Sequence, residues 1–106
     1  MQIRSIGQNE LQSVVERHLA ECSIEIRKFF AQVAFPPARW RLSPWGDRTG
    51  GFWAVAATGE RVLWYNEIEE GFNISRFVNS GEIPKEEYWC NQDTLCVALA
   101  KLISEP

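Results

Sequence analysis

The stretch that most constrains the fold lies between Phe52 and Phe72, where two apolar runs flank Thr58-Gly59-Glu60-Arg61. Glycine at the first position of a two-residue loop suits a type II′ hairpin turn, because that position needs a positive φ. With Gly59 and Glu60 as the loop, the expected pairs are Thr58 with Arg61, Ala56 with Leu63, Val55 with Trp64 and Ala54 with Tyr65. Small side chains then face large ones, so we predict an antiparallel hairpin at the centre of the fold.

Two helices are predicted around this hairpin. Apolar residues recur at three- and four-residue spacing in the first: Leu11, Val15, Leu19, Cys22, Ile26, Phe29, Phe30 and Val33. This pattern predicts a long helix from about Asn9 to Ala34, capped by Asn9, with a break into two helices near Cys22-Ser23 as the alternative. Phe35-Pro36-Pro37 should end it, because proline disfavours helix at the preceding residue. Asn91 or Asp93 should cap a second helix whose apolar face carries Leu95, Leu99 and Leu102.

The remaining segments predict short strands. Residues 39–42 alternate polar and apolar side chains, residues 72–77 suit a strand or an irregular edge, and residues 83–89 give at most a short strand. The expected fold class is α+β: residues 1–106 form a single domain, in which a small antiparallel sheet of three to four strands packs against a long N-terminal helix and a C-terminal helix. In the hairpin both faces of each strand are apolar, so the face away from the long helix should be covered or form an interface.

Charge and cysteine usage limit the classes of partner and location. The net charge of −3 argues against nucleic acid, whose binding proteins usually carry a basic surplus. No apolar run is long enough to cross a membrane, and the N-terminus lacks the apolar core of a signal peptide. Three cysteines match no zinc spacing, and Cys22 and Cys96 fall on apolar helix faces, where free cysteine acts as a small hydrophobic residue. We therefore expect a reducing, cytoplasmic location.

Three short motifs resemble a group of small bacterial proteins of unknown function. They are Trp64-Tyr65-Asn66, then Ile68-Glu69-Glu70-Gly71-Phe72-Asn73 with Ser75, and Tyr88-Trp89-Cys90-Asn91-Gln92. The resemblance implies a compact stand-alone domain with no assigned chemistry. Many bacterial proteins of this size and class look like immunity or accessory proteins.

No catalytic signature is present, so we expect no enzymatic activity, no cofactor and no metal. Glu67, Glu69 and Glu70 could bind a cation if their oxygens converged, but an exposed acidic strand end is the favoured interpretation. His18 and Cys22 lie on one apolar stripe, where a hydrogen-bonded buried histidine is favoured over a catalytic Cys–His pair. The amides of Asn66, Asn73 and Asn91-Gln92 are expected to bond backbone groups, with direct ligand recognition as the alternative.

Our first functional hypothesis is a non-enzymatic module that binds another protein, such as an immunity or regulatory protein. Eight acids stand between Glu60 and Asp93 against three bases, and aromatic residues stand beside them. The glycine-rich loop at residues 46–51 adds an aromatic and arginine rim of the kind that binding hot spots use. The predicted surface comprises Trp45, Arg48, Trp53, Tyr65, Asn66, Glu67, Glu69, Glu70, Asn73 and Tyr88.

Two other hypotheses follow from the same pattern. One is a small-ligand-binding or enzymatic domain with a pocket between the sheet and the long helix, lined by Asn66, Asn73, Arg76 and Tyr88. The other is a homodimer that buries the free face of the sheet. A deep cavity would support the former, and a packed core would remove it.

Overall fold

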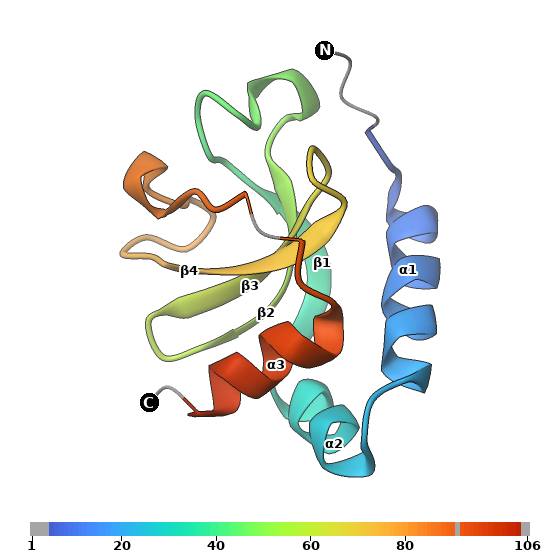
Figure 1. The fold of residues 1–106 in the computed structure, drawn as a ribbon. Helices are drawn as coiled ribbons and strands as arrows, with labels where there is room; N and C mark the ends of the chain where they lie inside the picture. The colour runs from blue at the N-terminus through green and yellow to red at the C-terminus, as the bar shows by residue number, and fades with distance from the viewer. Residues whose placement is uncertain (1–4, 91, 105–106) are drawn as a thin grey trace.

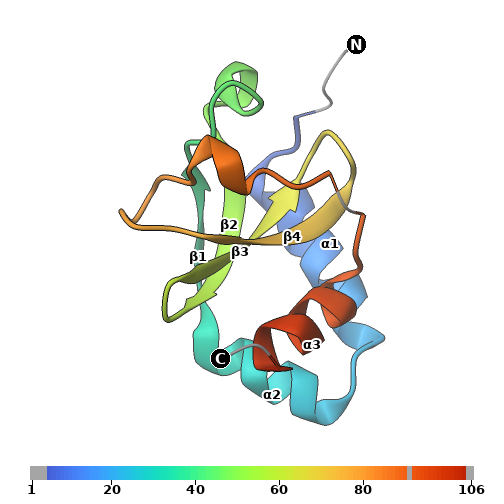
Figure 2. The same cartoon turned by 60° about the vertical axis from the view of Figure 1, so that its left-hand side comes forward.

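A computed structural model describes residues 5–90 and 92–104 of the chain. Two helices, α1 (Gln8–Ala20) and α2 (Ile24–Val33), precede four strands, and helix α3 (Leu95–Ser104) follows them. The strands are β1 (Ala34–Trp40), β2 (Phe52–Thr58), β3 (Arg61–Asn66) and β4 (Gly71–Arg76). They form one antiparallel sheet in the order β1-β2-β3-β4, and the helices lie together on one side of it (Figure 1, Figure 2). The predicted α+β class is confirmed.

The central hairpin forms, but its pairing register shifts by one residue between Ala56 and Ala54. Gly59 has a φ of 59°, and the pairs Thr58–Arg61 and Ala56–Leu63 are as predicted. Past an irregularity between Ala54 and Ala56, however, Trp64 pairs with Ala54 and Tyr65 with Trp53. The predicted pairs Val55–Trp64 and Ala54–Tyr65 are therefore wrong. The irregularity is a bulge that places Val55 and Ala56 together in the helix-side core, which strict alternation would not allow.

The N-terminal apolar stripe forms two helices, which was the alternative to one long helix. Gly7, and not Asn9, occupies the cap position of α1, because the helix begins at Gln8. Helix α1 ends at Ala20, and the Ser23 hydroxyl accepts the Ile26 N–H at 3.2 Å to begin α2. A serine cap satisfies a donor that the first turn of a helix leaves free, so it fixes the break.

The two prolines end α2 as predicted, but the strand that follows the helix already includes them and so begins earlier than expected. Strand β1 covers Ala34–Trp40 instead of residues 39–42 and lies at an edge of the sheet. Proline lacks the N–H that each residue of a central strand must donate. Pro36 and Pro37 are tolerated in β1 because an edge strand has one side without a neighbouring strand. The pairing with β2 shifts between Ala34 and Ala38, on either side of the prolines.

The sheet separates two hydrophobic cores. The helix-side core packs α1 and α3 against β2, β3 and β4 through fully buried residues such as Leu11, Leu63 and Leu99. On the opposite face, Trp64, Phe52 and Leu42 pack with Ile83, which comes from the segment after β4. That segment and residues 41–51 therefore cover the second face. The face predicted to be free for a homodimer is buried by the chain itself.

The C-terminal part also differs from prediction in detail. Residues 72–77 do form a strand, β4, whereas residues 83–89 contain a short 3₁₀ helix at Lys85–Glu87 instead of a strand. Helix α3 is capped by Thr94, whose hydroxyl accepts the Val97 N–H at 3.3 Å. Asp93 forms a bridge with Phe72 and an ion pair with Lys101, so it is not the cap. Asn91, the other predicted cap, lies outside the described residues.

Candidate functional site

Aromatic side chains gather where residues 41–51 meet the segment after β4. The indole of Trp45 stacks on the ring of Tyr88, with 4.2 Å between centroids and 7° between planes. Below them Phe52 and Trp64 fill the core, and each tilts against Tyr88. Trp45 keeps 36% of its surface exposed, and the adjacent Trp89 keeps 54%. Large apolar side chains this exposed mark places where a partner can bury them.

Asn66 attaches an acidic turn to this aromatic cluster. Its amide nitrogen donates to the Trp89 carbonyl at 2.9 Å and to the Tyr88 hydroxyl at 3.2 Å. Its amide oxygen accepts the backbone N–H groups of Ile68 and Glu69 at 3.0 and 3.3 Å. Asn66 is fully buried, so it bonds backbone groups as predicted and does not itself face solvent.

The turn held by Asn66 brings carboxylates to the aromatic rings. Burial raises the pKa of Tyr88, the hydrogen bond from Asn66 lowers it, and the nearby Glu69 carboxylate raises it further. The phenol therefore stays protonated at neutral pH. Glu70 is exposed and has a φ of 56°, the left-handed conformation that costs a non-glycine residue about 1 kcal/mol. We call Trp45, Glu69, Glu70 and Tyr88 the acidic aromatic surface; the side chain of Trp89 lines a separate groove beside β4 and α3.

Glu67 does not belong to this surface, which corrects the prediction of an exposed acidic strand end. Its side chain is fully buried and forms an ion pair with Arg39 of β1. Its second oxygen accepts the Ile6 N–H at 2.8 Å. The Arg39 guanidinium also donates to the Ile6 carbonyl at 2.9 Å and lies 4.4 Å from the centroid of Trp53. Glu67 thus fastens the segment before α1 to the sheet.

The other predicted surface residues fall in separate places. Trp53 donates from its indole nitrogen to the Ile6 carbonyl at 2.9 Å and packs against Arg39. Tyr65 is buried beside Phe72 in the helix-side core. Asn73 is buried on β4, and Arg48 is exposed on the same loop as Trp45. Of the ten residues predicted from sequence, Trp45, Tyr88 and Glu69 come together, with Asn66 behind them and Glu70 in the same turn as Glu69.

In the described part of the chain, Leu11, Leu63 and Phe72 fill the space between the sheet and α1 where a pocket was predicted. Asn66 and Tyr88 belong to the opposite face of the sheet. Asn73 and Arg76 do line a groove of about 710 Å³ beside β4 and α3, but neither Asn66 nor Tyr88 reaches it. The four proposed lining residues therefore do not converge on one cavity.

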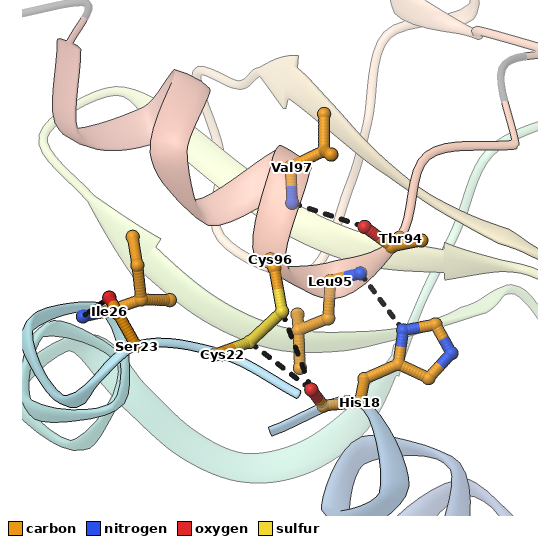
Figure 3. Close-up of a disulfide and its surroundings, with 8 residues drawn as sticks. All are labelled: His18, Cys22, Ser23, Ile26, Thr94, Leu95, Cys96 and Val97. Carbon is orange, nitrogen blue, oxygen red and sulfur yellow. Dashed lines mark hydrogen bonds between the residues drawn. A yellow bond between two sulfur atoms is a disulfide. The ribbon is translucent and has the colours of Figure 1, made fainter. Parts of the chain in front are cut away.

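His18 and the cysteines form a structural cluster that the sequence did not predict. Cys22 and Cys96 are joined in a disulfide, with Cα atoms 5.4 Å apart, so the prediction that both are free is wrong (Figure 3). Helical periodicity placed both on apolar faces but could not show that the two faces meet. His18 Nδ1 accepts the Leu95 N–H at 3.0 Å, which confirms the hydrogen-bonded histidine. Burial lowers the pKa of His18, and the neighbouring Arg17 lowers it further.

Reasoning from sequence also missed Trp89 as a surface residue and Arg39 as a buried partner. The signal for Trp89 is its isolation: it stands in a polar stretch and has no apolar partner at strand or helix spacing. Arg39 carried no comparable signal, because its partner is 28 residues away along the chain.

Among residues 5–90 and 92–104, no three histidine, cysteine or acidic side chains are placed so that they could share a metal ion. Of the helices in the described part of the chain, none combines the length and the apolar character that a membrane crossing needs.

The fold and the surface together define a small α+β protein with a four-stranded antiparallel meander and an acidic aromatic face. Comparison of the chain with family models, with curated proteins and with solved structures finds no match.

Proposed function

We propose that this chain is a non-enzymatic protein-binding module that uses the acidic aromatic surface to engage a basic partner, as an immunity or regulatory protein would. The observation that carries the proposal is the Trp45–Tyr88 stack, in which a partly exposed indole packs on a phenol that interacts with the Glu69 carboxylate. Rigid aromatic side chains lose little conformational entropy on binding, so they suit a hot spot.

The charges favour a cationic partner over an acidic one. Glu69 interacts with the Tyr88 phenol, Glu70 follows it in the same turn, and Glu86 and Glu87 precede Tyr88 along the chain. Complementary charge speeds encounter and fixes orientation, which is what an inhibitor of a protein with a basic active site requires. A bacterial origin, which the motif resemblance implies, and a cytoplasmic location complete the proposal.

The conformation of Glu70 gives a second, independent support. Its left-handed backbone would be relieved by glycine, so the carboxylate is kept at an energetic cost. Strained residues persist where the surrounding structure holds them and where the strained position serves a function.

A random peptide library displayed on phage tests the proposal through the chemistry of the peptides that it yields. We expect selection on the immobilised protein to enrich peptides that combine Lys or Arg with an aromatic residue. The variant Trp45→Ala/Glu69→Gln should bind those peptides at least about tenfold more weakly, because hot-spot truncations cost more than about 1 kcal/mol.

The matched control removes a similar apolar and acidic pair from exposed helix positions, Glu25→Gln with Val97→Ala. It should bind the selected peptides as the unmodified protein does. Absence of any enriched basic-aromatic consensus would refute the proposal, and so would equal loss of binding in the control.

A further inference from the structure

The Cys22–Cys96 disulfide lies at a joint of the helical layer. Cys22 stands in the short connection between α1 and α2, and Cys96 stands in the first turn of α3 (Figure 3). The two residues are 74 positions apart in sequence, so the bond ties the N-terminal helices to the C-terminal one. Opening it would release the beginning of α3 from the α1–α2 connection.

The two halves of the disulfide differ in accessibility. Cys22 keeps only 7% of its surface exposed. Cys96 lines a surface hollow of about 680 Å³ together with Arg17, His18, Ala20, Glu21 and Thr94, and Cys22 is not among the lining residues. A thiolate that approaches from solvent therefore meets Cys96 first.

The surroundings of Cys96 favour a thiolate. Cys96 is the second residue of α3, where the positive end of the helix dipole stabilises negative charge. Arg17 lines the same hollow and adds a cation, while the carboxylate of the exposed Glu21 opposes it. A stabilised Cys96 thiolate is a good leaving group, so these surroundings favour the last step of reduction, in which Cys96 is released.

The contacts around the two sulfurs also suit the reduced state, in which both cysteines are thiols. The His18 carbonyl oxygen lies 3.2 Å from the Cys22 sulfur and 3.4 Å from the Cys96 sulfur. Disulfide sulfurs carry no proton, so these contacts become hydrogen bonds only when the sulfurs are thiols. The bond from the Leu95 N–H to His18 Nδ1 involves neither sulfur, so local opening of the first turn of α3 after reduction requires that this hydrogen bond break as well.

We propose that the Cys22–Cys96 pair is a thiol–disulfide exchange switch, opened at Cys96 by a dithiol reductant that enters the hollow lined by Arg17 and His18. One thiolate of the reductant attacks Cys96 Sγ, the Cys22–Cys96 bond breaks, and Cys22 leaves as a thiolate that takes a proton. The second thiol of the reductant then closes its own disulfide and releases Cys96. Two electrons pass from the dithiol to the protein.

This inference does not depend on the proposed partner binding. The acidic aromatic surface is built from residues outside the helical joint.

The first test compares the reactivity of the sulfurs in a Cys90→Ser background, which removes the exposed free thiol. The folded protein is reduced with dithiothreitol, alkylated briefly with iodoacetamide and mapped by mass spectrometry. We expect Cys96 to be modified about tenfold faster than Cys22, and reduction to need no denaturant. Faster modification of Cys22, or reduction only in denaturant, would overturn the proposal.

Matched arginine variants test the hollow itself. Arg17→Gln should slow the alkylation of Cys96 severalfold, whereas Arg27→Gln on α2, which does not line the hollow, should leave the rate unchanged. Equal rates in the two variants would remove Arg17 from the mechanism and contradict the proposed site.

Hydrogen exchange of the intact chain tests the conformational part. On reduction, the amides of the first turn of α3 should exchange at least about tenfold faster, while those of β3 keep their protection, as expected for local opening. Global loss of protection would mean that the disulfide is a structural staple, and unchanged exchange would mean that the bond controls nothing. Either result would refute the switch.

Discussion

Replacing Glu67 by glutamine removes one charge from the most deeply buried ion pair of the described chain. The Glu67 side chain is fully buried, while the Arg39 side chain keeps 20% of its surface exposed. Glutamine has nearly the same shape, but its amide group must present a donor either to the Arg39 guanidinium or to the Ile6 N–H. One of these donors then lacks its acceptor, and a guanidinium loses its counter-charge.

The cost follows from how well Arg39 is compensated without Glu67. Removing one partner of a buried pair costs about 3–5 kcal/mol. Arg39 would keep its bonds to the Gly51 and Ile6 carbonyls, at 2.8 and 2.9 Å, and its contact with the Trp53 ring. We therefore expect a loss near the lower end of that range, about 3 kcal/mol. Such a loss is a large part of the roughly 5–15 kcal/mol that stabilises a typical domain.

Urea unfolding followed by tryptophan fluorescence measures this loss. With a denaturant slope of about 1.5 kcal/mol per molar, the midpoint should fall by about 2 M. The control Glu70→Gln removes a charge from an exposed neighbour and should change stability by less than about 0.5 kcal/mol. A second check is salt: because the pair is buried, the difference between Glu67→Gln and the unmodified protein should persist at about 1 M sodium chloride.

Two outcomes would refute this reasoning. If Glu67→Gln unfolded at the same urea concentration as the unmodified protein, the carboxylate would be solvated, as expected of an exposed strand end. If the loss were abolished by salt, the pair would be an exposed one of little value.

Three further predictions concern the asparagine, the strained turn and the histidine. Asn66→Ala should destabilise the protein by about 2–3 kcal/mol in urea, because it leaves the Trp89 carbonyl and two backbone N–H groups without their partner; a loss below about 0.5 kcal/mol would contradict it. Glu70→Gly should raise stability by up to about 1 kcal/mol while weakening the binding of the selected peptides, and a loss of stability would disprove the strain. Since the His18 pKa is lowered on folding, the unfolded chain takes up the proton first, so stability is full above pH 6.5 and declines as the pH falls below it. His18→Gln should flatten this decline between pH 6.5 and about pH 5, a range that lies above the ordinary pKa values of carboxylates. An unchanged pH profile would contradict this prediction.

Local sequence chemistry determined the central turn and the end of α2. Gly59 set the hairpin because a tight reversal needs a positive φ, and Pro36 and Pro37 ended α2 because they cannot continue a helix. The α+β class followed from these signals together with the apolar periodicity. Each of them acts within a few residues, so a single sequence is enough to see it.

The acidic aromatic surface could be predicted only in part, because signals that act within a few residues do not show which distant residues meet. Trp45, Glu69, Glu70 and Tyr88 could be named as polar and aromatic residues in loops. That Trp45 stacks on Tyr88, far along the chain, depends on how the two covering segments cross the sheet. Glu67 looked identical to Glu69 in sequence, and only the position of Arg39 on β1 decided that one is buried and the other is not.

By itself, then, the sequence determined the turn of the hairpin, the end of α2 and the α+β class. Tertiary structure alone decided the Cys22–Cys96 bond, the Arg39–Glu67 pair and the bulge at Val55. The physical reason is separation along the chain: these contacts join elements whose approach is fixed by the packing of the whole core, and no local propensity encodes that approach.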